Sequence, residues 1–410
     1  MFIIFSIIKV QNYKYSAKKA NNLLNLLSRL VAGTYSLSVI NTSTGSVTAT
    51  NNISKDTLKK LKYILLPITW IYALVIWIRH RLFDAGKLKS KRFNLPVICV
   101  GNITVGGTGK TPFTEYLIRL LQDSFPVAVV SRGYKRKSKG MQVSSEKATA
   151  EILGDEPYQI YKKYPKTLVV ADSNRCRAIE YIKGNHKEVK AVILDDAFQH
   201  RYVNTRCRIL LIDYNRPIKD DYLLPVGNLR DLKSAQRRAS IIVVTKCPKD
   251  LKPIDFRNLI KEINPLPYQS LFFSCLDYDT PYHCQTGEKV ELTSEDSLVL
   301  FTGIAKPQPL EDYLSANVKE LKSIKFADHH NYGKNDNENI YAEFLKLASE
   351  NKWIITTEKD AAKLDSFSDE IKERLIIIPV KIKILNNEED VLSKKIKDYV
   401  EKNRRNSLLS

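Results

Sequence analysis

The sequence is poor in cysteine, and its cysteines form no recognisable framework. The six cysteines, at positions 99, 176, 207, 247, 275 and 284, include no Cys-x-x-Cys pair. Disulfide-rich secreted domains and structural zinc sites usually contain closely spaced cysteines. We therefore expect a protein of a reducing cytosol without structural zinc.

Acidic residues are also in deficit. The chain has 45 Asp and Glu residues and 65 Lys and Arg residues, which gives a formal net charge of +20. Such a charge favours an anionic partner: nucleic acid, anionic lipid or a phosphorylated substrate. Charge alone does not choose among these. With 43% hydrophobic residues in 410, the chain can form one large or two moderate globular domains.

The N-terminal region lacks an apolar run long enough to cross a membrane easily. Residues 63–78 are apolar and uncharged, but at about 1.5 Å per residue they fall short of a hydrocarbon core of about 30 Å. Basic residues flank this run and Trp70 and Trp77 lie within it. We predict a membrane-anchor helix at 57–80, spanning or interfacial, with its C-terminal side in the cytoplasm. A buried core helix is the alternative.

Residues 1–56 lack the pattern of a folded domain. A short apolar start, MFIIFSIIKV, leads into the polar linker INTSTGSVTATNNISKD. We expect this extension to be mostly disordered. Because Met1 and Met141 are the only methionines, we also expect the natural start near Leu58, at a non-AUG codon.

One glycine-rich segment has the pattern of a phosphate-binding loop. TVGGTGKTP, residues 104–112, lies between the strand pattern of residues 97–100 and a helical pattern from Pro112. Lys110 would reach the β- and γ-phosphates, and Thr111 would ligate Mg²⁺. A glycine turn with a solvated lysine is the alternative, and Thr104 stands where the usual pattern has glycine. The residues predicted to bind ATP are Thr104, Val105, Gly106, Gly107, Thr108, Gly109, Lys110 and Thr111.

This chain lacks the key residue of two classes of phosphate-loop protein. Partitioning-type ATPases carry a signature lysine where this chain has Val105. GTPases read guanine with an aspartate where this chain has Pro248, after Thr245 and Lys246. The sequence therefore favours ATP.

Strand and helix patterns alternate after the loop, and polar residues follow the strands. The predicted strands are 127–131, 167–172, 190–196, 208–213 and 240–246. We predict an α/β fold with a P-loop NTPase-like parallel sheet domain at 81–265 and a smaller α/β domain at 295–402, before a tail at 403–410. Ligands bind at the carboxyl ends of such strands. Asp195 there has the Walker-B arrangement for Mg²⁺, with a helix N-cap as the alternative.

Nine motifs occur in one order between about residues 58 and 400: GNITVGGTGKTP, SRGY, GDEP, DDAFQHR, LPVGNLRD, VVTKCP, FTGIAKP, DHHNY and TTEKDAAKL. Together they resemble the tetraacyldisaccharide 4′-kinase (LpxK) family. The resemblance implies transfer of the ATP γ-phosphoryl group to the 4′-hydroxyl of tetraacyldisaccharide 1-phosphate, giving lipid IVA. It implies a monomer on the cytoplasmic face of the bacterial inner membrane, without nucleic acid or a protein partner.

The resemblance also implies roles for single residues. Asp155 is the candidate general base, with a capping aspartate as the alternative. His329 is preferred over His330 as its partner, and surface histidines are the alternative. The implied metal site comprises Thr111, Asp195, Asp196 and Asp231, and the implied substrate contacts are Arg132, Tyr134, Gln199, His200 and Arg201. The family's two-stranded connection would fall at 266–294.

Several assignments stay open on the residues alone. His200 and Arg201 fit structural hydrogen bonding as well as substrate contact. Lys359 and Asp360 fit a structural ion pair. Two other functions stay open: a phosphate-loop enzyme acting on a soluble anion, and a membrane-tethered nucleotide switch. The absence of the signature lysine at Val105 and of the guanine-reading aspartate at Pro248 argues against the switch.

Overall fold

The computed structural model describes residues 55–134, 136–304, 307–327, 330, 332–361 and 367–408. Almost all of the extension at 1–56, with its predicted disorder and start site, lies outside the described residues. The chain divides into two compact units. The first contains the N-terminal helix with Ile103–Gly106 and Pro217–Gln236, and the second contains the two β-sheets.

The first unit is built on one long helix, α3 (Lys55–Asp84). The hydroxyl of Tyr72 donates to the carbonyl of Arg230 at 3.1 Å, and the His80 ring bonds the Asp231 carboxylate at 2.6 Å. The buried side chains recur every three or four residues, as expected for one face of a helix. They are Leu65, Thr69, Tyr72, Ile76, His80 and Phe83.

The opposite face of α3 is apolar and exposed. Its exposed large side chains are Ile68, Trp70, Ile71, Leu74, Trp77, Ile78 and Leu82. The segment Leu65–Asp84 is long and apolar enough to cross a membrane by length and composition, with a mean hydropathy of 1.2. The helix is therefore compatible with membrane association.

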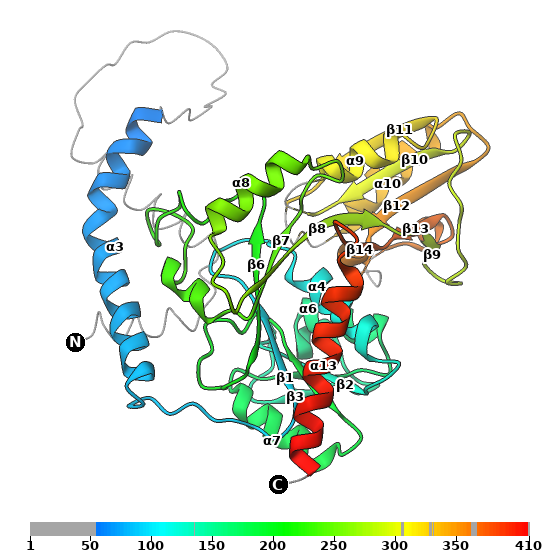
Figure 1. The fold of residues 1–410 in the computed structure, drawn as a ribbon. Coiled ribbons are helices and arrows are strands. Elements are labelled where there is room, and N and C mark those ends of the chain that lie inside the picture. Colours follow the sequence, from blue (N-terminus) through cyan, green and yellow to red (C-terminus); the bar gives the residue numbers. More distant parts are fainter. Residues whose placement is uncertain are drawn as a thin grey trace. The chain divides into compact units, whose positions relative to one another are not determined.

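The larger sheet of the second unit has nine strands in the order β14-β8-β7-β6-β1-β5-β2-β4-β3 (Figure 1). All neighbouring strands are parallel except the outer pairs β14–β8 and β3–β4. The predicted parallel α/β sheet is thus confirmed. The strands are β1 (Val97–Gly101), β2 (Val127–Ser131), β3 (Gln142–Val143), β4 (Leu168–Ala171), β5 (Ala191–Leu194), β6 (Cys207–Asp213), β7 (Ile241–Thr245), β8 (Ser270–Tyr278) and β14 (Val380–Ile384).

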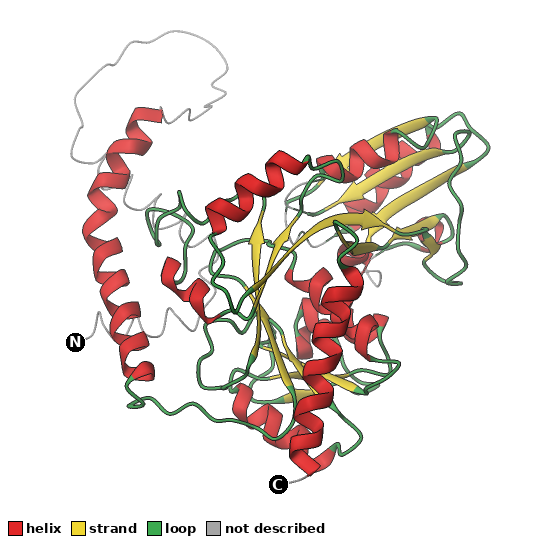
Figure 2. Cartoon of the chain, in the orientation of Figure 1, coloured by secondary structure: helices red, strands yellow, loops and turns green. Residues whose placement is uncertain are grey.

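Helices cover both faces of this sheet (Figure 2). Alternate strand residues point to opposite faces, so Ile98 packs with α4, α6 and α13 while Val97 packs with α7. Strands buried on both faces read as continuous apolar runs, which explains why the sequence revealed them. The helical segments are α4 (Lys110–Leu121), α5 (Ala150–Leu153), α6 (Asp155–Lys163), α7 (Arg175–Asn185), η1 (Lys233–Arg238, at the unit boundary), α8 (Pro253–Ile263) and α13 (Glu389–Leu408).

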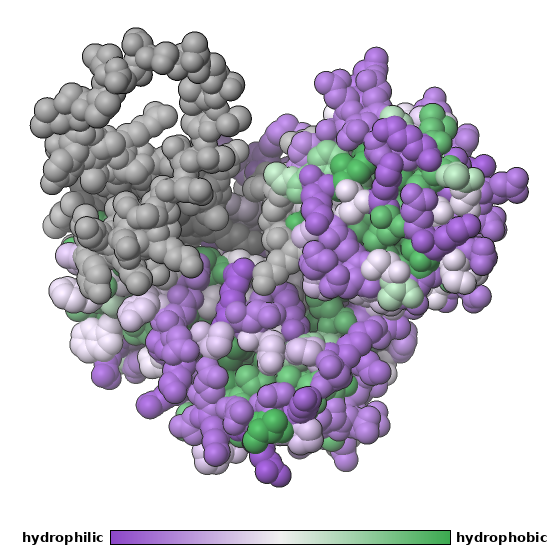
Figure 3. All heavy atoms as spheres, turned by 90° about the horizontal axis from the view of Figure 1, so that it is seen from above, coloured by the Kyte–Doolittle hydropathy of each residue, from purple (hydrophilic) through white to green (hydrophobic). Residues whose placement is uncertain are grey.

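A second sheet of five strands has the order β11-β10-β12-β13-β9, parallel except for β9. Its strands are β9 (Tyr282–His283), β10 (Ser297–Thr302), β11 (Glu320–Lys325), β12 (Lys352–Thr357) and β13 (Leu375–Ile378). Its helices are α9 (Gln308–Ser315), α10 (Lys334–Leu345), α11 (Glu358–Ala361) and α12 (Asp369–Lys372). Hydrophilic residues dominate the face drawn in Figure 3, in keeping with the basic composition.

The domain boundaries predicted from the sequence remain an interpretation. β8 pairs with β14, and both strands belong to the larger sheet. Ile382 of β14 and Ile396 of α13 lie in the core beside that sheet, although both fall within the range 295–402. This packing groups β14 and α13 with the larger sheet, because their apolar residues are buried there.

Candidate active site

The phosphate loop ends where α4 begins. Gly109, with a φ of 79°, adopts a left-handed conformation that glycine accepts without strain, and Lys110 is the first residue of α4. The Lys110 side chain is mostly buried, and its Nζ lies 3.9 Å from Oδ1 of Asp196. A mostly buried ammonium at a helix N-terminus fits phosphate binding.

The end of β7 supports the second half of this loop. The hydroxyl of Thr245 donates to the carbonyl of Thr108 at 2.9 Å, and Lys246 donates to the carbonyl of Gly107. Lys246 also lies 2.8 Å from the carboxylate of Asp213 at the end of β6. Burial alone would raise the pKa of Asp213, but Lys246 and the hydrogen bonds from Asn215 together outweigh burial and lower that pKa. The VVTKCP motif thus holds the loop in place.

The first half of the loop belongs to the first unit. Thr104 forms an antiparallel bridge with Leu229, and the amide of Val105 donates to the carbonyl of Asn228 at 2.7 Å. Gly106 has a φ of 100°, which a residue with a side chain rarely adopts. The LPVGNLRD motif therefore fixes the loop entrance through its backbone.

Two carboxylates follow β5. Asp195 is buried and accepts hydrogen bonds from the hydroxyls of Thr114 at 3.3 Å and Ser131 at 3.4 Å. Asp196 adopts a left-handed φ of 47° and faces Lys110. Carboxylate and hydroxyl oxygens are the donors that Mg²⁺ prefers. The described residues contain no group of three or more His, Cys, Asp or Glu that could hold a metal ion, whereas Mg²⁺ in nucleotide sites usually keeps phosphate and water ligands.

Two loops meet beside the start of α6. A Cβ on Gly154 would lie 2.9 Å from the carbonyl oxygen of Tyr134, and one on Gly133 would lie 2.6 Å from the carbonyl oxygen of Leu153. Both glycines have positive φ values, so no other residue fits easily. This contact brings Arg132 and Tyr134, in their loop, close to Asp155, the first residue of α6.

The DDAFQHR motif continues past the carboxylates. Gln199 donates to the carbonyl of Asn102 at 2.6 Å. The rings of His200 and Tyr202 lie 5.5 Å apart, and the carbonyl of Arg201 accepts from Ser90 at 2.6 Å. These contacts fix the turn, and they leave substrate contacts by Gln199, His200 and Arg201 a prediction.

Asp231 has a partner that the sequence did not suggest. Besides His80, its carboxylate accepts a hydrogen bond from the amide of Leu232 at 2.8 Å. These contacts tie the LPVGNLRD loop to α3 within the first unit. A metal-shell role for Asp231 remains a prediction.

The two histidines of DHHNY differ in what the structure describes. His329 lies outside the described residues. His330 bonds the Asp336 carboxylate at 2.9 Å and stacks on Phe326. Nearby, the buried Asp360 accepts from the Gly303 amide, the Tyr332 hydroxyl and the Thr357 hydroxyl. Asp360 therefore holds three C-terminal motifs together.

Arg175 is a candidate that the sequence interpretation missed. It begins α7, just beyond the carboxyl end of β4, and is 4% exposed. Burial, followed by the charge of Arg132, lowers its pKa to about 10, whereas Asp196 and Asp195 act in the opposite direction. Its Nε has no hydrogen-bond partner within the described structure. Its position just after a predicted strand was the available signal in the sequence.

Comparisons with known proteins agree with the motifs. A family model described as tetraacyldisaccharide-1-P 4′-kinase (LpxK) matches residues 61–401. The tetraacyldisaccharide 4′-kinase of Bacteroides thetaiotaomicron is 43% identical over 366 residues, covering 86% of this chain and 96% of its own length. That of Flavobacterium johnsoniae is 41% identical over 346 residues, covering 84% and 98%. A crystal structure of LpxK from Aquifex aeolicus in complex with ATP is 31% identical and covers 83% of this chain and 99% of its own, with a TM-score of 0.65.

Proposed function

Because this chain belongs to the tetraacyldisaccharide-1-P 4′-kinase (LpxK) family, we propose that its site transfers the γ-phosphoryl group of ATP to the 4′-hydroxyl of tetraacyldisaccharide 1-phosphate. The chain is an ATP-using kinase of lipid A biosynthesis. The observation that carries the proposed site is Lys110, mostly buried at the start of α4 and facing Asp196 at the end of β5.

We assign ATP to residues 104–111. Backbone amides of the loop and the Lys110 ammonium would bind the phosphates, and the contacts of Thr245 and Lys246 would keep the loop amides in place. Preorganised donors of this kind stabilise charge as it develops in the transition state.

Thr111, Asp195 and Asp196 fit a Mg²⁺ ion, because the two carboxylates directly follow β5 and the Thr111 hydroxyl belongs to the first turn of α4, whose Lys110 faces Asp196. Such an ion supplies charge neutralisation on the transferred phosphoryl group. Asp231 would contribute to its water shell.

We assign Asp155 as the general base. In the transfer, the bond between the γ-phosphorus and the oxygen bridging to the β-phosphate breaks, and a bond from the 4′-oxygen to phosphorus forms. The hydroxyl proton passes to the Asp155 carboxylate, which lies half-buried at the first turn of α6. His329 would orient this carboxylate.

The acceptor would lie near the loops after β2 and β5. Arg132 and Tyr134, close to Asp155, and Gln199, His200 and Arg201 are the proposed substrate contacts. Arg175 adds a buried guanidinium near Asp195 and Asp196, which suits an anionic oxygen.

We place the protein at the cytoplasmic face of the bacterial inner membrane, as a monomer. The exposed apolar face of α3, with Trp70 and Trp77, would contact lipid, and the basic residues that follow would face anionic headgroups.

The test is purified protein with γ-labelled ATP and tetraacyldisaccharide 1-phosphate. Label should move to the lipid for the wild type, and Lys110→Ala should lose this transfer. Absence of label on the lipid with folded wild-type protein would refute the proposal.

A further inference from the structure

Three charged residues from separate elements of the second unit meet in one cluster. Glu115 lies in the second turn of α4, Lys163 is the last residue of α6, and Glu358 is the first residue of α11. We call them the Glu115–Lys163–Glu358 cluster. They connect two helices of the larger sheet with the end of β12 in the smaller sheet.

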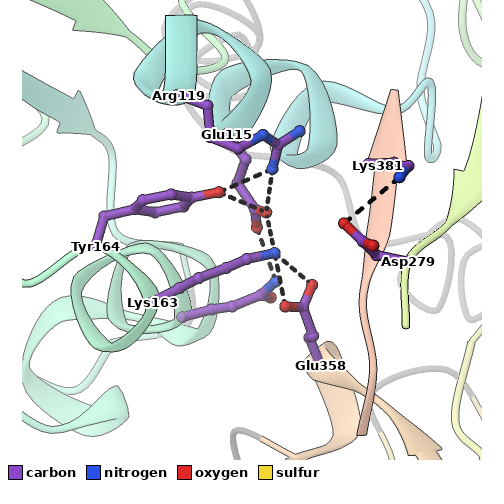
Figure 4. Close-up of polar contacts among 8 residues, drawn as sticks. Glu115, Arg119, Lys163, Tyr164, Asp279, Glu358 and Lys381 are labelled. Atoms are coloured by element: carbon purple, nitrogen blue, oxygen red, sulfur yellow. Dashed lines mark hydrogen bonds and ion pairs between the residues drawn. The ribbon is translucent and has the colours of Figure 1, made fainter. Parts of the chain in front are cut away.

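Lys163 is the centre of the cluster (Figure 4). Its Nζ lies 2.6 Å from Oε2 of Glu115 and 2.6 Å from Oε1 of Glu358. Gln159, one turn earlier on α6, donates to Oε1 of Glu115 at 3.1 Å. Arg119 approaches Oε2 of Glu115 only to 4.0 Å. The ammonium of Lys163 therefore bridges the carboxylates of Glu115 and Glu358.

The cluster is largely removed from water. The side chain of Glu115 is 2% exposed and that of Glu358 is 9% exposed. Burial, followed by the charge of Glu115, raises the pKa of Glu358 despite Lys163. Burial alone would lower the pKa of Lys163, but the two carboxylates outweigh it and raise that pKa.

A buried ion cluster is weak support for stability, because desolvation offsets most of its attraction. Such a cluster instead fixes where its elements lie. Helix α6 has nine residues, with Lys163 at one end and Asp155 at the other. A shift at Lys163 would therefore move Asp155, and displacements near 1 Å lower rates by roughly 10²-fold.

We propose that Lys163 is a positioning residue of the phosphoryl transfer. It holds α6, and with it Asp155, against α4, which starts at Lys110, and against the start of α11. This inference rests on the proposed function, because it takes Asp155 as the base. Without Lys163, the carboxylates of Glu115 and Glu358 repel each other and the three elements separate.

The test compares Lys163→Met, Glu358→Gln and the double variant by kcat, KM for ATP and KM for the lipid acceptor. We expect Lys163→Met to lower kcat roughly 10- to 100-fold and to change the KM for ATP little. Glu358→Gln removes one buried negative charge, so the double variant should lose less than Lys163→Met alone. Lys163→Arg should restore part of kcat.

Lys162→Met is the matched control. Lys162 is the preceding residue of α6, but it is exposed and lies over the Tyr158 ring. Its replacement should leave kcat unchanged. Hydrogen exchange of the α6 amides, measured without acceptor, should rise in Lys163→Met and stay at the wild-type level in Lys162→Met.

Wild-type kcat in Lys163→Met, or losses that multiply in the double variant, would overturn the inference. If Lys163→Met fails to fold, Glu358→Gln and Lys163→Arg test the positioning role of Lys163 instead. An unchanged kcat in Glu358→Gln, together with no activity in Lys163→Arg, would contradict that role. A wild type without lipid phosphorylation would instead refute the proposed function, and the exchange data would still report on the cluster.

Discussion

The hydroxyl of Thr245 donates a 2.9 Å hydrogen bond to the main-chain carbonyl of Thr108. This bond joins the carboxyl end of β7 to the middle of the phosphate loop, across 137 positions of sequence. Lys246, the next residue, reaches the carbonyl of Gly107. Two consecutive side chains at the end of β7 thus hold the main chain of the phosphate loop.

Thr245→Val should weaken ATP binding, because it keeps the shape of a buried side chain and removes its donor. A buried carbonyl left without its donor costs about 1–3 kcal/mol, so we expect a roughly tenfold rise in the Kd for ATP, measured by equilibrium titration. Thr245→Ser keeps the hydroxyl and is the control. Equal affinities for the two variants would contradict this role.

Lys110→Ala should abolish turnover while leaving the fold intact. Losing one donor to the transferring phosphate commonly lowers the rate by roughly 10²-fold or more. Steady-state kinetics with a far-UV spectrum checks both points. A kcat near the wild-type value would remove the loop lysine from the mechanism.

Asp195→Ala and Asp196→Ala should raise the Mg²⁺ concentration needed for half-maximal rate and lower kcat. Asp231→Ala should do the same if Asp231 contributes to the water shell, and it should also loosen α3 because His80 loses its partner. Mg²⁺ titrations of the three variants measure this. Wild-type titration curves for all three would refute the metal assignment.

The ion pair between Asp213 and Lys246 should make the stability of the fold depend on pH in the acidic range. Because Lys246 lowers its pKa below the ordinary 3.8, the Asp213 carboxylate stabilises the fold above pH 3.8 and loses this effect as pH falls through the lowered pKa. Denaturant unfolding at several pH values should show a smaller loss of stability on acidification for Asp213→Asn than for wild type. Parallel curves would contradict the assigned ion pair.

The strands and the phosphate loop could be predicted because their signals are local. Residues 127–131 form a buried apolar run, and Gly109 directly precedes the helix that begins at Lys110. The roles of Thr245 and Lys246 could not be predicted in this way. Their motif showed only that guanine reading was absent, and the contact with the loop depends on β7 and β1 lying in one sheet.

The Glu115–Lys163–Glu358 cluster could not be predicted from local sequence either. Lys163 and Glu358 are 195 positions apart, and each looks like a surface charge at a helix end. Only the folded arrangement reveals that Lys163 contacts both Glu115 and Glu358 and that the two carboxylates are largely removed from water. The His80–Asp231 contact was hidden for the same reason, since a histidine in an apolar helix gives no sign of its partner.

The pairing of Asp155 with His329 predicts non-additive losses. Asp155→Asn keeps the shape and removes the basicity, so kcat should fall with little change in ATP affinity. His329→Ala should lower kcat and alter the acidic limb of its pH profile. The double variant should lose far less than the product of the single losses. Full multiplicativity would mean that the two residues act independently.

Transfer to one particular hydroxyl distinguishes this kinase from any other ATP-using lipid kinase, and the position of the new phosphate on the product reports it. Wild-type protein would be incubated with ATP and either tetraacyldisaccharide 1-phosphate or its 4′-deoxy analogue, and the lipid product examined by ³¹P NMR. We expect a second phosphate monoester, at the 4′-position, and no product from the analogue. Phosphorylation of the 4′-deoxy analogue, or a monoester at another hydroxyl, would contradict it.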